Sequence, residues 1–171
     1  HYQQDYFAAA TRLLMARATI PISKQGDEPE LLLGALYILY GLEDAAAEIF
    51  ERMSTSDAVA KHTRDQAWFY LGKLRYAQQD YAAAVAAFEK TGEKLPNELA
   101  AERTHLLTTA LLQQRKTNEA IALLESFTGP RTWQRYARLN LGFTLLANSR
   151  QREAKEVLAK LLDDKSTDNE S

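Results

Sequence analysis

The sequence contains no cysteine and is poor in the two residues that interrupt helices, with 7 glycines and 4 prolines among 171 residues. The absence of cysteine excludes disulfide bonds, zinc sites with thiolate ligands, iron–sulfur clusters and a cysteine nucleophile. It does not fix the compartment, because a chain without cysteine is compatible with oxidising and with reducing surroundings. Leucine and alanine dominate instead, and this composition is typical of an all-α protein.

The sequence also lacks an excess of one charge and a long apolar run. The 21 Lys and Arg residues stand against 23 Asp and Glu, so the net charge is -2. No global positive field therefore attracts nucleic acid or an anionic membrane. The longest apolar stretch, residues 31–42, is interrupted by Gly34 and Gly41 and falls short of the roughly 20 residues that span a bilayer. The sequence predicts no transmembrane segment.

Residues that carry catalysis or bind metals are scarce. The three histidines, His1, His62 and His105, are widely separated and lack the spacing of a metal site. No glycine-rich phosphate loop and no nucleophile elbow around a serine occur. Acidic pairs such as Glu43 and Asp44 fall at predicted helix starts, where they favour capping over acid–base catalysis. We therefore predict no enzymatic activity, no metal and no cofactor.

The chain has a regular ladder of alanines, each followed four residues later by a large apolar residue. A residue pair with this spacing shares one helix face, so the small member permits close packing and the large one fills the next gap. Recurrence every 34 to 38 residues is typical of a helical solenoid. The pairs are Ala9 and Leu13, Ala46 and Phe50, Ala84 and Phe88, Ala120 and Leu124, and Ala154 and Leu158.

The segment from Trp68 to Pro96 shows the repeat most fully. Its marker residues are Trp68, Leu71, Gly72, Ala84, Phe88 and Pro96. This pattern resembles the tetratricopeptide repeat, although Arg75 stands where that family has an aromatic residue. A second copy contains Leu33, Gly34, Tyr37, Ala46 and Phe50, and two more degenerate copies follow in register.

The resemblance implies a right-handed α-solenoid of about four and a half repeats with about nine antiparallel helices. We expect a half repeat over residues 1–20, full repeats near 27–60, 65–98, 101–132 and 135–162, and a disordered polar tail over 163–171. Residues 3–9 nearly copy residues 78–84, so the first segment is predicted to be the second helix of a repeat. We accordingly expect the array to continue before His1, as part of a larger bacterial protein or assembly.

In tetratricopeptide arrays the first helices line a concave groove that binds partners, and the register assigns such positions here. The candidate partner-binding residues are Leu31, Ile38, Phe69, Lys73, Tyr76, His105, Leu112, Tyr136, Leu139 and Phe143. A groove of this apolar and aromatic character suits an amphipathic helix or an apolar peptide of another protein. The family's carboxylate clamp is absent, because Leu31, Ala35 and Phe69 stand at three of the four positions compared.

Several alternatives remain open from the sequence. The apolar groove residues are equally consistent with burial beneath neighbouring helices of a longer array. A related type of helical repeat binds RNA, but only Lys73 adds positive charge among the groove positions. The chain is also compatible with an accessory region of an enzyme or a secretion assembly, and with self-association through exposed repeat ends. For localisation the sequence favours the bacterial periplasm or cell envelope, with the cytoplasm as the alternative.

Overall fold

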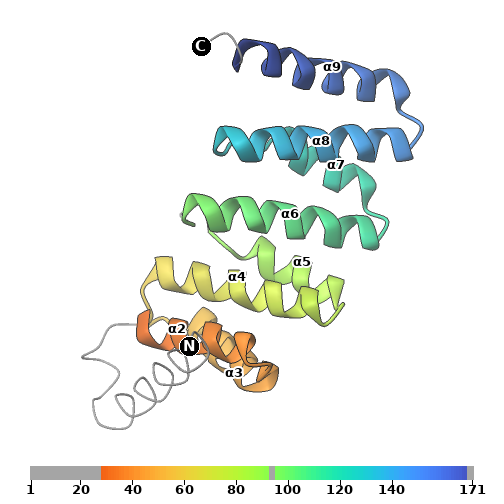
Figure 1. Cartoon of the computed structure of the whole chain (residues 1–171). Coiled ribbons are helices and arrows are strands. Elements are labelled where there is room, and N and C mark those ends of the chain that lie inside the picture. Colours follow the sequence, from red (N-terminus) through yellow and green to blue (C-terminus); the bar gives the residue numbers. More distant parts are fainter. Residues whose placement is uncertain (1–27, 93–94, 169–171) are drawn as a thin grey trace. The chain divides into compact units, whose positions relative to one another are not determined.

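The computed structural model describes residues 28–92 and 95–168, and these residues form helices with no strand (Figure 1). The first four helices are α2 (Glu28–Leu39), α3 (Glu43–Thr55), α4 (Lys61–Ala77) and α5 (Tyr81–Glu89). They are followed by α6 (Asn97–Gln113), α7 (Thr117–Glu125), α8 (Arg131–Ala147) and α9 (Gln151–Asp168). The predicted all-α class is confirmed, whereas the half repeat over residues 1–20 lies outside the described residues.

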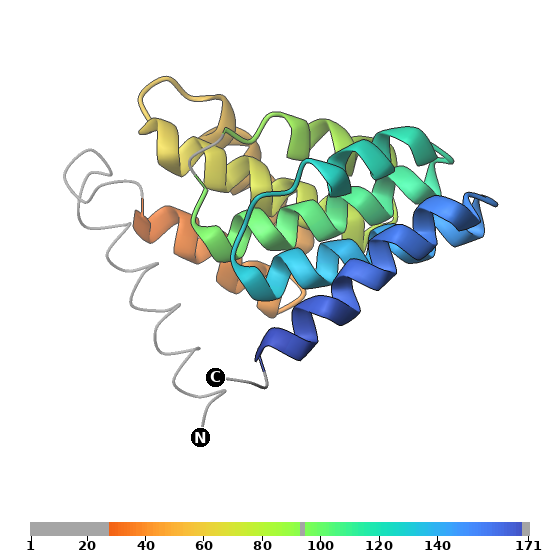
Figure 2. The same cartoon turned by 90° about the horizontal axis from the view of Figure 1, so that it is seen from above.

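The chain divides into two compact units, one ending at Leu95 and the other beginning at Pro96. In the first unit α2 packs against α3, α3 against α4 and α4 against α5, and α2 also contacts α4. In the second unit α6 packs against α7, α7 against α8 and α8 against α9. In Figure 2, α9 (dark blue) crosses in front of α8 (lighter blue). Each unit is thus a pair of helical hairpins.

The two helices of a hairpin pack closely where a glycine of the first helix faces a large residue of the second. A Cβ placed on Gly34 would lie 2.6 Å from the Phe50 ring, and one on Gly72 would lie 2.6 Å from Phe88. At Gly142 the atom met is Leu158 Cδ2 at 2.5 Å. These distances are too short for a side chain, so the glycines are required for close approach.

The alanine ladder forms part of the core in both units. Ala46, Ala84, Ala120 and Ala154 are all 0% exposed, and so are Phe50 and Phe88. The helix-face argument made from the sequence is therefore confirmed for these repeats. Ala9 and Leu13, the first pair of the ladder, lie outside the described residues.

The four hairpin corners share one backbone motif. Gly41, Gln79, Arg115 and Ser149 all have a φ between 61 and 71°. At the α4–α5 corner the N–H of Gln79 donates to Tyr76 O, and the N–H of Asp80 donates to Arg75 O. The equivalent two hydrogen bonds occur at the other three corners. This is the Schellman motif, in which the last carbonyls of a helix accept hydrogen bonds from the N–H groups that follow it.

The first helices begin earlier than the repeat register predicts. We expected starts near residues 65, 101 and 135, whereas α4, α6 and α8 begin at Lys61, Asn97 and Arg131. Pro96 and Pro130 directly precede two of these helices with φ of -50 and -54°. Proline cannot continue a helix that precedes it, but it is compatible with the start of a helix that follows it. Each proline therefore ends the preceding connection, and the next helix begins directly after it.

The expected disordered tail is wrong for residues 163–168, because α9 continues to Asp168. The prediction rested on the lack of apolar residues beyond Leu162. However, the stretch also contains no glycine or proline, so nothing interrupts the backbone hydrogen bonds that already run through α9. Residues 169–171 lie outside the described part of the chain.

Two carboxylates are buried in the first unit, those of Glu30 and Asp65, and the Asp65 carboxylate is paired with Lys61. The Glu30 side chain is 9% exposed and accepts two hydrogen bonds from the Arg52 guanidinium, one of them 3.2 Å long from Nη1 to Oε2. This fork joins α2 to α3 and supplies the charge that a buried carboxylate needs.

Candidate functional site

In the first unit, three of the predicted groove residues belong to the protein interior. Leu31 is 8% exposed, and Ile38 is half-buried against the apolar core formed by α2, α3 and α4. Phe69 is 0% exposed, with its ring centroid 5.2 Å from that of Tyr70 and 6.2 Å from that of Phe88. Phe69 is therefore a packing residue, and the expectation that a partner contacts it is wrong.

The other two predicted residues of this unit lie near the end of α4. Lys73 and Tyr76 are half-buried, and the Tyr76 ring meets the edge of Tyr81 with centroids 5.6 Å apart. A pocket of about 210 Å³ between α2 and α4 includes Leu31 among its lining residues, but neither Lys73 nor Tyr76. The first unit thus gathers little of the predicted site.

The second unit brings its predicted residues to accessible positions. Tyr136 and Phe143 are 41% and 58% exposed, while His105, Leu112 and Leu139 are half-buried. The rings of His105 on α6 and Tyr136 on α8 meet edge to face, with centroids 5.3 Å apart. This contact joins the two first helices of the unit.

A cavity of about 470 Å³ lies between α6 and α8, and we call it the α6–α8 groove. Its lining residues are His105, Thr108, Thr109, Leu112, Thr117, Asn140, Phe143, Thr144, Ala147 and Asn148. Three predicted residues, His105, Leu112 and Phe143, meet here. Tyr136 and Leu139 instead line a neighbouring apolar pocket with Leu158, Leu161 and Leu162 of α9.

The α6–α8 groove combines apolar surface with uncharged polar groups, and none of its lining residues is Lys, Arg, Asp or Glu. The Thr109 hydroxyl donates to His105 O at 3.0 Å, and Asn148 Nδ2 donates to Thr144 O at 2.8 Å. Among the described residues, the half-buried Asn140 side chain makes no hydrogen bond. Its amide therefore offers both a donor and an acceptor to a bound molecule.

The sequence reasoning did not select Asn140. The sequence nevertheless contained a signal for this residue. Asn140 interrupts the apolar run from Leu139 to Phe143, and asparagine has a low propensity for the interior of a helix. The residue was passed over because the register assigned the groove to its neighbours Leu139 and Phe143. Polar residues that break an apolar helical stretch are thus useful markers of such a groove.

Within residues 28–92 and 95–168, no cluster of three or more histidines and carboxylates is arranged to hold a metal ion. The helices in the same ranges include none with the length and apolar character required to span a bilayer.

The charges of the second unit include one paired set at the start of α9. Arg150 donates to both carboxylate oxygens of Glu153, from Nε at 2.7 Å and from Nη2 at 2.5 Å. These hydrogen bonds lower the pKa of Glu153 below its ordinary value and raise the pKa of Arg150. The pair lies on the surface and helps to hold the first turn of α9.

Residues 66–98 match the model of the tetratricopeptide repeat family. The chain thus contains a tetratricopeptide repeat in this segment. The matched segment spans most of α4 and α5, where the sequence pattern is most complete, so the predicted resemblance is confirmed.

Solved structures show the same repeat fold over nearly the whole chain. One is a crystal structure of the nearly identical TPR-like repeats of a kinesin light chain from Podosopora anserina. It superposes on this chain with a TM-score of 0.74 at 17% identity, and the match covers 99% of this chain and 89% of that one. A crystal structure of MamA superposes with a TM-score of 0.76 at 18% identity, covering 99% and 94%. Another MamA structure, AMB-1, reaches 0.67 at 20% identity, covering 95% and 88%. A search of curated proteins found no match.

Proposed function

We propose that this chain is a scaffold that binds a segment of a partner protein in the α6–α8 groove. The single observation that carries the proposal is the accessible pair of Phe143 and Asn140 in one cavity. Phe143 is 58% exposed, so its ring is accessible to a partner. Asn140 lies three residues before it on α8 and makes no hydrogen bond within the described part of the chain.

The chemistry of the groove favours an uncharged peptide segment. Leu112 and Phe143 provide an apolar surface on which a leucine or aromatic side chain of the partner packs. The Asn140 amide pairs with one peptide group of the same segment, accepting from its N–H and donating to its C=O. Because no charged residue lines the groove, a carboxylate or ammonium group entering it would lose hydration without gaining an ion pair.

The proposal is tested by comparing capture of partners by the wild-type chain and two variants. The double variant Asn140→Ala with Phe143→Ala removes both features of the groove. Leu146→Ala is the matched control, since Leu146 is an exposed apolar residue of α8, 44% exposed, that does not line the groove. Circular dichroism should show all three proteins equally helical, because the substituted side chains are exposed or make no hydrogen bond within the described chain.

We expect the wild-type chain and Leu146→Ala to capture the same protein from a lysate of the source organism, with the double variant retaining less than a tenth of it. Losing one apolar anchor typically costs 2 kcal/mol or more, which is about a thirtyfold loss of affinity. Equal capture by the folded double variant would exclude the α6–α8 groove as the binding site. Capture of RNA in place of protein would assign the chain to the alternative class.

A further inference from the structure

A second cavity lies on a different face of α8, and its walls come from α7, α8 and α9. The volume is about 460 Å³. Its lining residues from α8 are Gln134, Ala137, Arg138 and Leu141. Ala137 and Arg138 each lie three or four residues from both Gln134 and Leu141, so the four share one helix face. Asn140, Phe143 and Ala147 of the α6–α8 groove lie on another face of α8. We call the second cavity the rear pocket.

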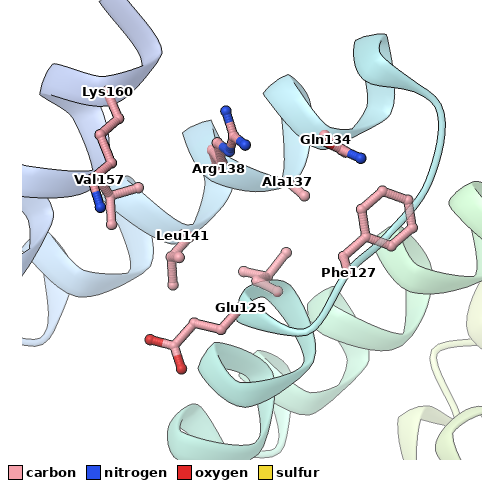
Figure 3. A pocket seen from close by; sticks show the side chains of 9 residues that line it. Glu125, Phe127, Gln134, Ala137, Arg138, Leu141, Val157 and Lys160 are labelled. Carbon is pink, nitrogen blue, oxygen red and sulfur yellow. The ribbon is translucent and has the colours of Figure 1, made fainter.

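The three helices around the rear pocket differ in length. α7 ends at Glu125 after 9 residues, whereas α9 has 18 residues and α8 has 17. Leu124 is thus in the last turn of α7 and closes one end of the cavity, while Val157 and Lys160 on α9 extend beyond it. Figure 3 shows Phe127 and Val157 on opposite sides, with Ala137 and Leu141 of α8 between them.

The wall around Phe127 is held in place by its own connection. A Cβ on Gly129 would lie 2.3 Å from the tip of the Phe127 ring, so the backbone passes directly against that ring. Gln134 Nε2 donates to Gly129 O at 2.8 Å and joins the connection to the first turns of α8. The pocket is therefore present before any ligand binds, which lowers the entropy cost of binding.

The floor of the rear pocket is apolar and its rim is charged. Leu124, Ala137 and Leu141 are each 5 to 6% exposed and form the floor. Arg138 and Lys160 at the rim are cationic, and Glu125 is the anionic residue. Within the described residues Lys160 forms no ion pair.

The surroundings of the pocket share this positive charge. Arg131, Arg135 and Arg138 lie on one stripe of α8, and that helix contains no acidic residue. The second unit as a whole, residues 96–171, is nearly balanced, with eleven Lys and Arg against ten Asp and Glu, so the positive charge is concentrated on α8. The local field therefore favours an anionic partner, although the whole chain carries a net charge of -2.

We propose that the rear pocket binds a partner protein's segment in which a large apolar side chain is followed by a carboxylate. The apolar side chain occupies the space above Ala137 and Leu141, beside Phe127. The carboxylate meets Lys160 at the rim. This second site is independent of the α6–α8 groove, and it would allow one chain to hold two partner segments at once.

The test uses the full chain with carbon-13 labelled leucine and valine methyl groups and two peptides, each acetylated and amidated. One peptide carries phenylalanine followed by aspartate and glutamate between glycine and serine residues. The other has asparagine and glutamine in place of the two acids. We expect the acidic peptide to shift the methyl signals of Leu124, Leu141 and Val157, and to bind at least threefold more tightly than the amide peptide.

Variants then locate the site. Lys160→Gln should remove the preference for the acidic peptide, while Lys155→Gln, an exposed lysine of the same helix that does not line the pocket, should keep it. Val157→Phe should fill the cavity and abolish the shifts at Leu124 and Leu141. If that variant fails to keep its circular dichroism spectrum, the two lysine variants still decide the question.

The outcome is separable from that of the α6–α8 groove, because Phe143→Ala should leave peptide binding in the rear pocket unchanged. The proposal is overturned if the acidic peptide leaves all three methyl signals unmoved. It is also overturned if the two peptides bind equally, or if the peptide shifts the Leu112 methyl signals of the groove instead.

Discussion

Replacing Gly72 by alanine tests the packing that defines the hairpins of this protein. A Cβ at this position lies 2.6 Å from the Phe88 ring, whereas ordinary van der Waals contact begins at 3.4 Å. Phe88 is 0% exposed and has no open space into which to withdraw. The substitution therefore forces α4 and α5 apart or moves the ring.

Two opposing effects set the magnitude. Alanine in place of glycine within a helix stabilises by about 1 kcal/mol. Inserting a methyl group into a filled core costs about 1 to 3 kcal/mol. We expect Gly72→Ala to lower the free energy of unfolding by about 1 kcal/mol. In a Phe88→Leu background the steric conflict is relieved, and the same substitution should become neutral or stabilising. The double-mutant cycle should then give a coupling energy of about 1 to 2 kcal/mol.

The chain offers a probe that reports on one unit at a time. Trp68 is on α4 and Trp133 is on α8, so a Trp133→Phe background leaves fluorescence from the first unit alone. This matters because repeat proteins can unfold in parts. Urea unfolding followed at Trp68 gives the four free energies of the cycle. If Gly72→Ala stabilises by the full 1 kcal/mol with Phe88 present, the close-packing explanation is refuted.

Three further predictions concern single features. Arg115→Gly should raise the free energy of unfolding of the second unit by about 0.5 to 1 kcal/mol, measured at Trp133, because Arg115 has a φ of 61° that glycine adopts without strain. Arg52→Met should lower the free energy of unfolding of the first unit by about 1 to 3 kcal/mol, since it removes the two hydrogen bonds from the Arg52 guanidinium to the buried Glu30 carboxylate. An unchanged urea midpoint at Trp68 would contradict this. The pKa of Glu153 should lie below that of an ordinary glutamate in carbon-13 NMR, and Arg150→Gln should bring its pKa back to the ordinary value. Because the folded-state pKa is lowered, the stabilisation is present above the unfolded pKa and is lost as the pH falls through the folded value. An unchanged Glu153 titration in Arg150→Gln would show that another group lowers its pKa.

Much of the fold was predictable because it depends on local patterns. The alanine ladder located the repeats, since a small residue and a large apolar residue four positions apart share the helix face that packs in the core. Helix ends were harder to predict. The repeat register placed the start of α6 at residue 101, yet Pro96 allows it to begin at Asn97. The end of α9 was placed too early because the absence of apolar residues does not by itself stop a helix.

The candidate site was predictable only in part. The register correctly selected Phe143, which is exposed, and Phe69, which is fully buried, as residues of first helices. It did not distinguish between them, because exposure depends on which other helices and side chains cover each position. Asn140 was missed for the same reason, since its importance for binding depends on the cavity that it lines.

The sequence by itself determined the helical composition, the repeat length, the alanine ladder and the absence of cysteine chemistry. These follow from residue types and their spacing along the chain, which act within a single helix or between two consecutive helices. Only the tertiary structure decided which apolar residues are accessible and where cavities form. The α6–α8 groove and the rear pocket depend on how three neighbouring helices pack together in space, and no periodicity of residue types records that geometry.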